Sequence, residues 1–280
     1  VNMLIVFCAM IGMFMAWNTE ASQPFSLQLF FWATLGIAML SAAAAVVNCL
    51  IEKQIDAKMA RTAWRPLPSG NLSTNQTLIF AILLGAIGFT ILITFVNSIT
   101  AYLTLATFAG YAFLYTVVLK PLTPQNIVIG GASGAMPPVL GWAAVNGSVS
   151  PEAWLLFLII FVWTPPHFWA LALYRVDDYK RTGLPMLPVT HGSKFTRLQI
   201  LLYASLLFPV ALSPVLVGMS SYIYFVVSSV ATLYFIILCW RLYIEYSERT
   251  ARYVFRYSIY YLSLVFAGLI IDKLVMQLVV

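Results

Sequence analysis

Hydrophobic residues in this 280-residue chain gather into nine continuous runs separated by polar connections. Each run is close to the roughly 20 residues that an α-helix needs to cross a bilayer. The runs do not alternate with polar residues, as the strands of a transmembrane β-barrel would. The pattern therefore predicts an all-α polytopic membrane protein, a bundle of nine transmembrane helices. The predicted spans are residues 1–17, 27–47, 76–96, 99–119, 125–145, 153–173, 199–217, 221–243 and 254–276.

The composition supports this class, with 62% hydrophobic and only 9% charged residues. Soluble domains carry about 25% charge, so a soluble enzyme, a disordered chain and a nucleic-acid-binding protein are excluded. No linker or second domain is visible, and we predict that residues 1–280 form a single transmembrane domain. The chain opens with Val1 inside an apolar run and without an initiator Met, so we expect a polar lead-in to the first helix to be missing.

The three cysteines, Cys8, Cys49 and Cys239, lie far apart, and none forms a CxxC pair. Disulfides and a thiolate metal site are therefore not expected.

Positive charge alternates along the connections between the runs. All but one of the 15 Lys and Arg residues lie in the even-numbered connections, and the exception is Lys273. By the positive-inside rule these connections face the cytoplasm, which places the N-terminus inside and the C-terminus outside. We expect the protein in the cytoplasmic (inner) membrane. The two long cytoplasmic connections, 48–75 and 174–198, also hold several acids, and they are the candidate site.

The first candidate cluster is Asn48, Glu52 and Asp56. A spacing of four residues keeps side chains on one stripe of a helix. Carboxylate and amide oxygens suit Mg²⁺, which also takes phosphate oxygens of a substrate. Three cations that could clamp a diphosphate follow along the chain: Lys58, Arg61 and Arg65. The alternative is that these charges form ordinary ion pairs at the membrane boundary.

The second candidate cluster offers the same chemistry from the other long connection. Asp177 and Asp178 are flanked by Arg175, Lys180 and Arg181. If the two connections meet, their acids and cations can hold Mg²⁺ and a diphosphate between them. Boundary ion pairs remain the alternative here as well.

The chain has two histidines, His167 and His191. His167 falls within the sixth predicted span, where an unpaired polar group is costly. It can contact a porphyrin, act as a base, or bond a backbone carbonyl freed by Pro165 and Pro166. His191 lies in a cytoplasmic connection beside Lys194. It can bind phosphate or carboxylate groups of a ligand, or it can be an ordinary solvent-exposed histidine.

Several motifs resemble the UbiA-type intramembrane prenyltransferases, and most closely their heme-farnesylating branch. The matching segments are Asn48-x3-Glu52-x3-Asp56-x-Lys58-Met59-x-Arg61-Thr62-x2-Arg65-Pro66-Leu67, Gly131–Pro138, Pro166–Ala172, Asp177–Tyr179 and Leu184–Val189. The resemblance implies a site open to the cytoplasm and Mg²⁺-dependent transfer of farnesyl from farnesyl diphosphate to a vinyl group of heme B. Water is added in the reaction, and the product is heme O for heme-copper terminal oxidases.

The resemblance also implies roles for the candidate residues. Catalytic Mg²⁺ ligands would be Asn48, Glu52, Asp56, Asp177 and Asp178; diphosphate-binding cations would be Lys58, Arg61, Arg65, Lys180 and Arg181; heme-binding residues would be His167 and His191. Heme B is then a substrate rather than a cofactor. The expected partners are membrane lipid and heme A synthase or terminal-oxidase assembly factors. Nucleic acid is not an expected partner. The family usually has Asp where Glu52 stands and often a further Asp where Gln54 stands.

Two other functions fit parts of the pattern. A prenyltransferase acting on a quinone precursor or another aromatic acceptor would need the same diphosphate site. A transporter would place polar residues in broken helices at mid-membrane, whereas here the charges gather at one face.

Overall fold

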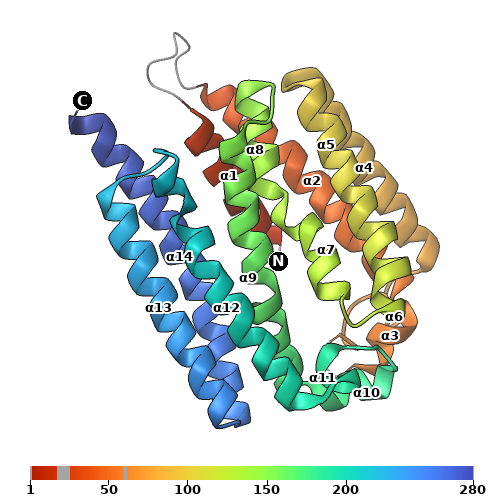
Figure 1. The fold of residues 1–280 in the computed structure, drawn as a ribbon. Coiled ribbons are helices and arrows are strands. Elements are labelled where there is room, and N and C mark those ends of the chain that lie inside the picture. The colour runs from red at the N-terminus through yellow and green to blue at the C-terminus, as the bar shows by residue number, and fades with distance from the viewer. Residues whose placement is uncertain (1, 18–25, 60–61, 280) are drawn as a thin grey trace. The chain divides into compact units, whose positions relative to one another are not determined.

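A computed structural model of the chain describes residues 2–17, 26–59 and 62–279 (Figure 1). Within these ranges the regular structure is entirely helical. Eight of the described helices are long and apolar enough to cross a membrane, judged by length and composition, and a shorter apolar helix covers Met3–Ala16. These helices follow the nine predicted runs, so the all-α polytopic fold is confirmed.

The chain divides into two compact units. Unit 1 comprises Val1–Val149 and Asp177–Pro185, and unit 2 comprises Ser150–Val176 and Met186–Val280. The helices of unit 1 are α1 (Asn2–Ala16), α2 (Leu27–Ile51), α3 (Lys53–Lys58), α4 (Thr74–Phe95), α5 (Ser98–Ala109), η1 (Gly110–Leu119), α6 (Lys120–Leu122), α7 (Asn126–Ala135), α8 (Pro137–Asn146) and, except for its first residue, α10 (Val176–Thr182). That the whole chain is a single domain stays a prediction.

Polar caps set where several of these helices begin. The Ser26 hydroxyl accepts a hydrogen bond from the backbone N–H of Leu29 ahead of α2. Ser73 and Gln76 form a reciprocal capping box at the start of α4, and the Asn97 carboxamide caps α5. Such caps satisfy amide groups that the first turn leaves free. They explain why α4 starts two residues before the predicted run.

Helices α1 and α8 approach so closely that their backbones touch. A Cβ atom at Gly12 would lie 2.0 Å from the carbonyl oxygen of Pro138, and one at Gly141 would lie 1.9 Å from that of Ala9. Small residues permit this kind of approach between apolar helices. No side chain fits at either glycine unless the two helices separate.

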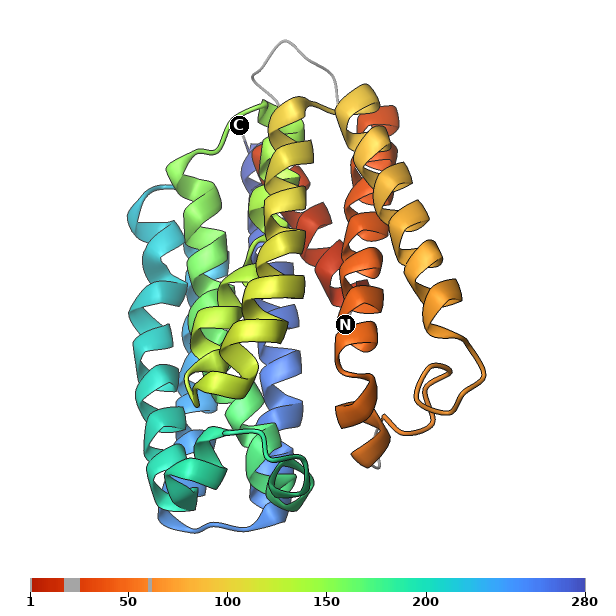
Figure 2. The same cartoon turned by 90° about the vertical axis from the view of Figure 1, so that its right-hand side faces the viewer.

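Two of the predicted spans depart from a regular α-helix. The run predicted at 99–119 is a continuous rod in which α5 passes into the π-helix η1 and then α6 (Figure 2). The run predicted at 125–145 is split between α7 and α8 at Met136. Pro137 and Pro138 lack the amide hydrogens that would continue α7, but they fit the first turn of a new helix.

Unit 2 consists of α9 (Pro151–Tyr174), α11 (Leu187–Thr190), α12 (Gly192–Leu216), α13 (Tyr222–Ile244) and α14 (Glu248–Val279). Its four long helices form a ring in which α9 and α13 each pack against both α12 and α14. Tyrosine hydroxyls link neighbours: Tyr224 donates to the Ala211 carbonyl at 2.6 Å and Tyr257 to the Ala231 carbonyl at 2.9 Å. Internal partners of this kind are required where water is absent.

A buried carboxylate from α14 caps the start of α13. Asp272 is fully buried and accepts hydrogen bonds from the Ser221 amide at 2.5 Å, the Ser221 hydroxyl at 2.7 Å and the Tyr224 amide at 3.2 Å. The positive end of a helix dipole favours an anion at this place. Asp272 thus ties the C-terminal part of α14 to the N-terminal end of α13.

Candidate functional site

Asn48, Glu52 and Asp56 lie along the junction between α2 and α3. The helix changes direction at Glu52, which ends α2, and α3 begins at Lys53. The Glu52 amide still donates to the Asn48 carbonyl at 2.9 Å, and the Asp56 amide donates to the Glu52 carbonyl at 2.8 Å. The four-residue spacing therefore continues across the junction, and all three side chains are buried.

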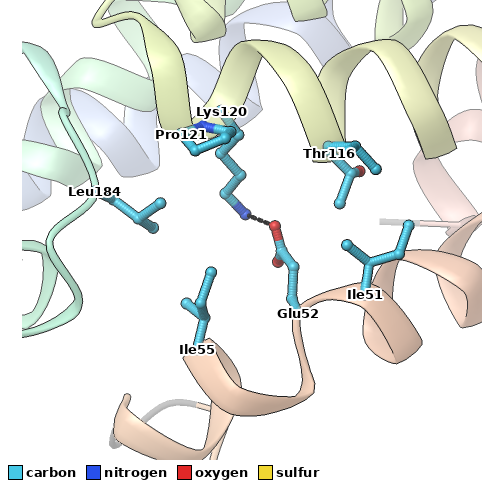
Figure 3. A pocket seen from close by; sticks show the side chains of 8 residues that line it. Ile51, Glu52, Ile55, Thr116, Lys120, Pro121 and Leu184 are labelled. Carbon is cyan, nitrogen blue, oxygen red and sulfur yellow. Dashed lines mark hydrogen bonds and ion pairs between the residues drawn. The ribbon is translucent and has the colours of Figure 1, made fainter.

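Two residues of the η1–α6 rod pair with this stripe. The Asn48 side-chain amide donates to the Thr116 hydroxyl at 3.1 Å, and the Lys120 ammonium donates to the Glu52 carboxylate (Figure 3). Lys120 also lies 5.9 Å from the centre of the Tyr115 ring. The sequence analysis did not include Thr116 or Lys120 in the site. The available signal was that Lys120 is the single cation of a short, otherwise uncharged connection.

The Glu52–Lys120 pair borders a cavity of about 190 Å³ in unit 1. Ile51 and Ile55 line one side, and Leu184 reaches it from the segment after α10 (Figure 3). The walls of the cavity combine one ion pair with aliphatic side chains. Both long connections thus contribute to this cavity, but the second contributes Leu184, and Asp177 and Asp178 are not among the residues that line it. That the acids of the two connections meet around one ion stays a prediction.

Asp56 is paired with a cation from its own connection. Arg65 donates to the Asp56 carboxylate at 2.7 Å, and the Thr62 hydroxyl donates to the Asp56 backbone carbonyl at 2.9 Å. Asp56 is only 3% exposed, whereas the side chain of Arg65 is 31% exposed. The carboxylate is thus fixed, and the guanidinium has room to move toward an incoming anion. Lys58 is exposed at the end of α3, and Arg61 lies outside the described residues.

The second predicted cluster is more open. Asp177 and Lys180 stand 3.9 Å apart on α10 with side chains that are 80% and 60% exposed. Asp178 is half-buried, and Arg181 is exposed.

Tyr115, the aromatic residue beside Lys120, packs against two neighbours. Its ring is stacked on that of Tyr111, and it fills the space where a Cβ atom at Gly130 would be. Gly130, which directly precedes the Gly131–Pro138 segment, therefore makes room for an aromatic side chain beside Lys120.

The described part of the chain contains no cluster of three or more His, Cys, Asp or Glu side chains arranged to hold a metal ion. Magnesium in nucleotide and phosphate sites is typically held by one or two carboxylates plus substrate oxygens and water. An all-oxygen set of buried carboxylates and an amide therefore fits this ion without a complete protein cage.

His167 lies in the core of unit 2. Its Nδ1 is 2.6 Å from the Ser258 hydroxyl, and its ring is stacked between Trp163 and Phe255. Ser258 donates its own proton to the Phe255 carbonyl at 2.6 Å, so it accepts from His167. The partner is a hydroxyl rather than the backbone carbonyl considered in the sequence analysis.

His191 is exposed and directly precedes α12, without a side-chain capping hydrogen bond to that helix. Its ring stacks on Phe195, and its Nδ1 is 2.8 Å from the Thr190 hydroxyl. Together with Lys194 and Tyr243 it borders a cavity of about 350 Å³ in unit 2. This cavity combines a cation with aromatic walls.

Relatives of the chain carry a consistent name. It is 61% identical over 272 residues to the protoheme IX farnesyltransferase of Aromatoleum aromaticum, covering 97% of this chain and 88% of the relative. It is 59% identical to the protein of the same name from Azoarcus sp., covering 97% and 90% of the two chains.

Solved structures share the fold. A digeranylgeranylglyceryl phosphate synthase gives a TM-score of 0.80 at 19% identity, covering 96% of this chain and 92% of that chain. A UbiA homolog from Archaeoglobus fulgidus, bound to DMAPP and Mg²⁺, gives 0.68 at 15% identity, covering 96% of both chains. The family model of the UbiA prenyltransferase family matches residues 5–265. Its span across both units, together with the highly identical relatives, shows that the chain belongs to the UbiA prenyltransferase family.

Proposed function

We propose that this chain transfers the farnesyl group of farnesyl diphosphate to a vinyl group of heme B, with addition of water, to give heme O. The proposal is supported by relatives named protoheme IX farnesyltransferase at 61% and 59% identity over 97% of the chain. The structural observation that carries it is the pairing of two buried carboxylates, Glu52 and Asp56, each with a cation.

These two ion pairs can bind Mg²⁺ and a diphosphate if each carboxylate exchanges its cationic side chain for the metal ion and each cationic side chain exchanges its carboxylate for the diphosphate. In this exchange the carboxylates of Glu52 and Asp56 would hold Mg²⁺, while Lys120 and Arg65 would move away from them to bind the diphosphate oxygens. A buried charge that loses its partner is strongly destabilising, and this exchange leaves none alone. Arginine and lysine are both suited to phosphate groups, the first as a fork and the second as a point charge.

The residues proposed to hold Mg²⁺ are Asn48, Glu52, Asp56, Asp177 and Asp178. Lys120 joins the predicted diphosphate-binding cations Lys58, Arg61, Arg65, Lys180 and Arg181. The chemistry that Mg²⁺ supplies when bound is stabilisation of the negative charge on the leaving diphosphate. The cations of the chain add fixed positive charge at the same oxygens, and such electrostatic stabilisation is often the largest catalytic contribution.

The apolar part of the cavity protects the reactive farnesyl cation. Ile51, Ile55 and Leu184 line it beside the ion pair. Water excluded from this surface cannot capture the cation before the vinyl carbon does.

The proposed contacts to heme B come from the histidines and a lysine of unit 2. His191 and Lys194 border one cavity there and could bind the heme carboxylates. His167 is the first proposed heme contact, and His191 is the second.

The membrane arrangement belongs to the same proposal. The positive-inside rule places the N-terminus and the active-site connections in the cytoplasm and the C-terminus outside, in the cytoplasmic (inner) membrane. Heme O made there would pass to heme A synthase or to assembly factors of a heme-copper oxidase.

The test uses the purified full chain with heme B, farnesyl diphosphate and Mg²⁺, and follows the heme product by mass spectrometry. The expected product has the mass of heme B plus one farnesyl group and one hydroxyl group, because the second proton of the added water is released together with diphosphate. EDTA should abolish its formation. A quinone precursor offered in place of heme B should stay unmodified. Farnesylation of that precursor, with heme B unchanged, would overturn the choice of acceptor.

A further inference from the structure

The η1–α6 rod meets the α2–α3 stripe at two matched positions. Thr116 faces Asn48 and Lys120 faces Glu52, and each pair joins residues that are 68 positions apart. Lys120 and Glu52 carry opposite charges and attract each other. Thr116 and Asn48 are both neutral, and the role of their contact follows from the directions of its hydrogen bonds.

The proton of the Thr116 hydroxyl is already committed. Its Oγ1 donates to the Tyr111 carbonyl at 2.9 Å, and a carbonyl can only accept. Towards Asn48 the hydroxyl oxygen can therefore only accept, and the NH₂ arm of Asn48 lies there at 3.1 Å. A flipped amide would place two acceptors in contact without a proton between them.

The π-helix sets up this arrangement. Tyr111 precedes Thr116 by five residues, which is the hydrogen-bond spacing of η1. Thr116 is 4% exposed and Asn48 is 8% exposed, so bulk water has little access to the pair. Among the described residues, no hydrogen bond reaches the other arm of the amide, Oδ1 of Asn48.

We infer that Thr116 is a positioning residue that holds the Asn48 amide with its oxygen, rather than its NH₂ group, toward the metal. The inference rests on the proposed function, in which Asn48 is an Mg²⁺ ligand. Only the amide oxygen can bind a cation, because the NH₂ group is a donor without an acceptor site. Partners behind a metal ligand orient it in this way in many metal sites.

The test measures metal binding without turnover. Mn²⁺ is titrated into the purified full chain in the presence of inorganic pyrophosphate, and free Mn²⁺ is read by electron paramagnetic resonance. Thr116→Val keeps the shape and removes the hydroxyl, and it should weaken Mn²⁺ binding about 10- to 100-fold. Thr116→Ser keeps the hydroxyl and should restore binding close to that of the parent chain.

Thr104→Val is the matched control. Thr104 is also buried in unit 1, and its hydroxyl donates to the Thr100 carbonyl at 2.6 Å without holding another side chain. This variant should bind Mn²⁺ like the parent. Equal weakening in T104V and T116V would show a general packing effect and overturn the inference.

The background Asn48→Asp separates orientation from packing. An aspartate has oxygen on both arms, so Thr116→Val should have little further effect there, and the two substitutions should not be additive. An equal loss in both backgrounds would overturn the positioning role. Should T116V fail to fold, Thr116→Ala replaces it in the same comparisons.

A further variant distinguishes this inference from the proposed function. Asp56→Asn should weaken Mn²⁺ binding whatever the role of Thr116. If D56N weakens binding and T116V does not, the inference is wrong and the metal site stands. If D56N also binds like the parent, the metal assignment itself fails, and the role of Thr116 fails with it.

Discussion

The buried carboxylates of the two units have different kinds of hydrogen-bond partner. Asp272 in unit 2 is held by two backbone amides and a hydroxyl, which are neutral groups at the fixed end of α13. Glu52 and Asp56 in unit 1 are held by Lys120 and Arg65, which are long, charged side chains. Donors on a helix end cannot move away, whereas cationic side chains can exchange partners. The nature of the partner, more than the degree of burial, thus separates a structural carboxylate from one suited to bind a ligand.

The largest effect should come from Asp56→Asn. The amide keeps the shape and removes the charge, so farnesyl transfer should fall at least about 100-fold, the scale of losing one strong electrostatic contact in a transition state. Thermal unfolding in detergent should change little, because Arg65 is partly exposed and can turn to water. Mass-spectrometric turnover beside a melting curve checks both, and turnover near that of the parent would remove Asp56 from the site.

Asp272→Ala should show the opposite profile. The change leaves three donors at the start of α13 without their acceptor. The cost in unfolding free energy should be about 2–3 kcal/mol, seen as a lower melting temperature. Turnover of the folded fraction should remain that of the parent. Asp272→Asn, which keeps one oxygen, should be milder, and a specific loss of turnover in either variant would contradict the structural role.

Lys120→Met tests the exchange of partners directly. The variant should raise the KM for farnesyl diphosphate about tenfold, equivalent to roughly 1.5 kcal/mol for a charged hydrogen bond. It should also lower the melting temperature, because Glu52 is left buried and alone. The double variant Glu52→Gln with Lys120→Met should recover stability but not KM, and Lys120→Arg should stay near the parent. Recovery of both by the double variant would mean that Lys120 serves only to neutralise Glu52.

The smallest effect on stability should come from Asp177→Asn. Its pairing with Lys180 spans 3.9 Å between highly exposed groups. Exposed pairs of this kind contribute little, and unfolding free energy should change by less than about 0.5 kcal/mol. A clear fall in melting temperature would show that α10 depends on this pair. A fall in turnover alone is the result expected of a metal ligand.

The helices could be predicted well from sequence because lipid demands long apolar runs. Their breaks were harder to predict: no run of residues signals the π-helix in η1, and Pro137 splits a span that remains apolar throughout. The stripe of Asn48, Glu52 and Asp56 follows from helix geometry alone and continues through the bend at Glu52.

Arg65, the partner of Asp56, was among the predicted cations of the site, but the partners of Asn48 and Glu52 could not be predicted. Lys120 and Thr116 come from a helix 68 positions away, and only tertiary packing decides which face of that helix meets α2. Asp272 reads in sequence as an acid near the last helix end, and its role depends on where α13 begins. Local patterns therefore predict which side chains line one helix, but not what they contact.

The contact between α1 and α8 has a consequence for how the protein is made. At Gly12 and Gly141 the two helices touch backbone to backbone, so α1 reaches its final packing only when α8 is present. The ribosome reaches α8 more than 100 residues after α1, on the order of ten seconds at ordinary translation speeds. During that interval α1 is without its α8 contact. The α1–α8 contact can therefore form only after nearly all of the first segment of unit 1, Val1–Val149, has been synthesised.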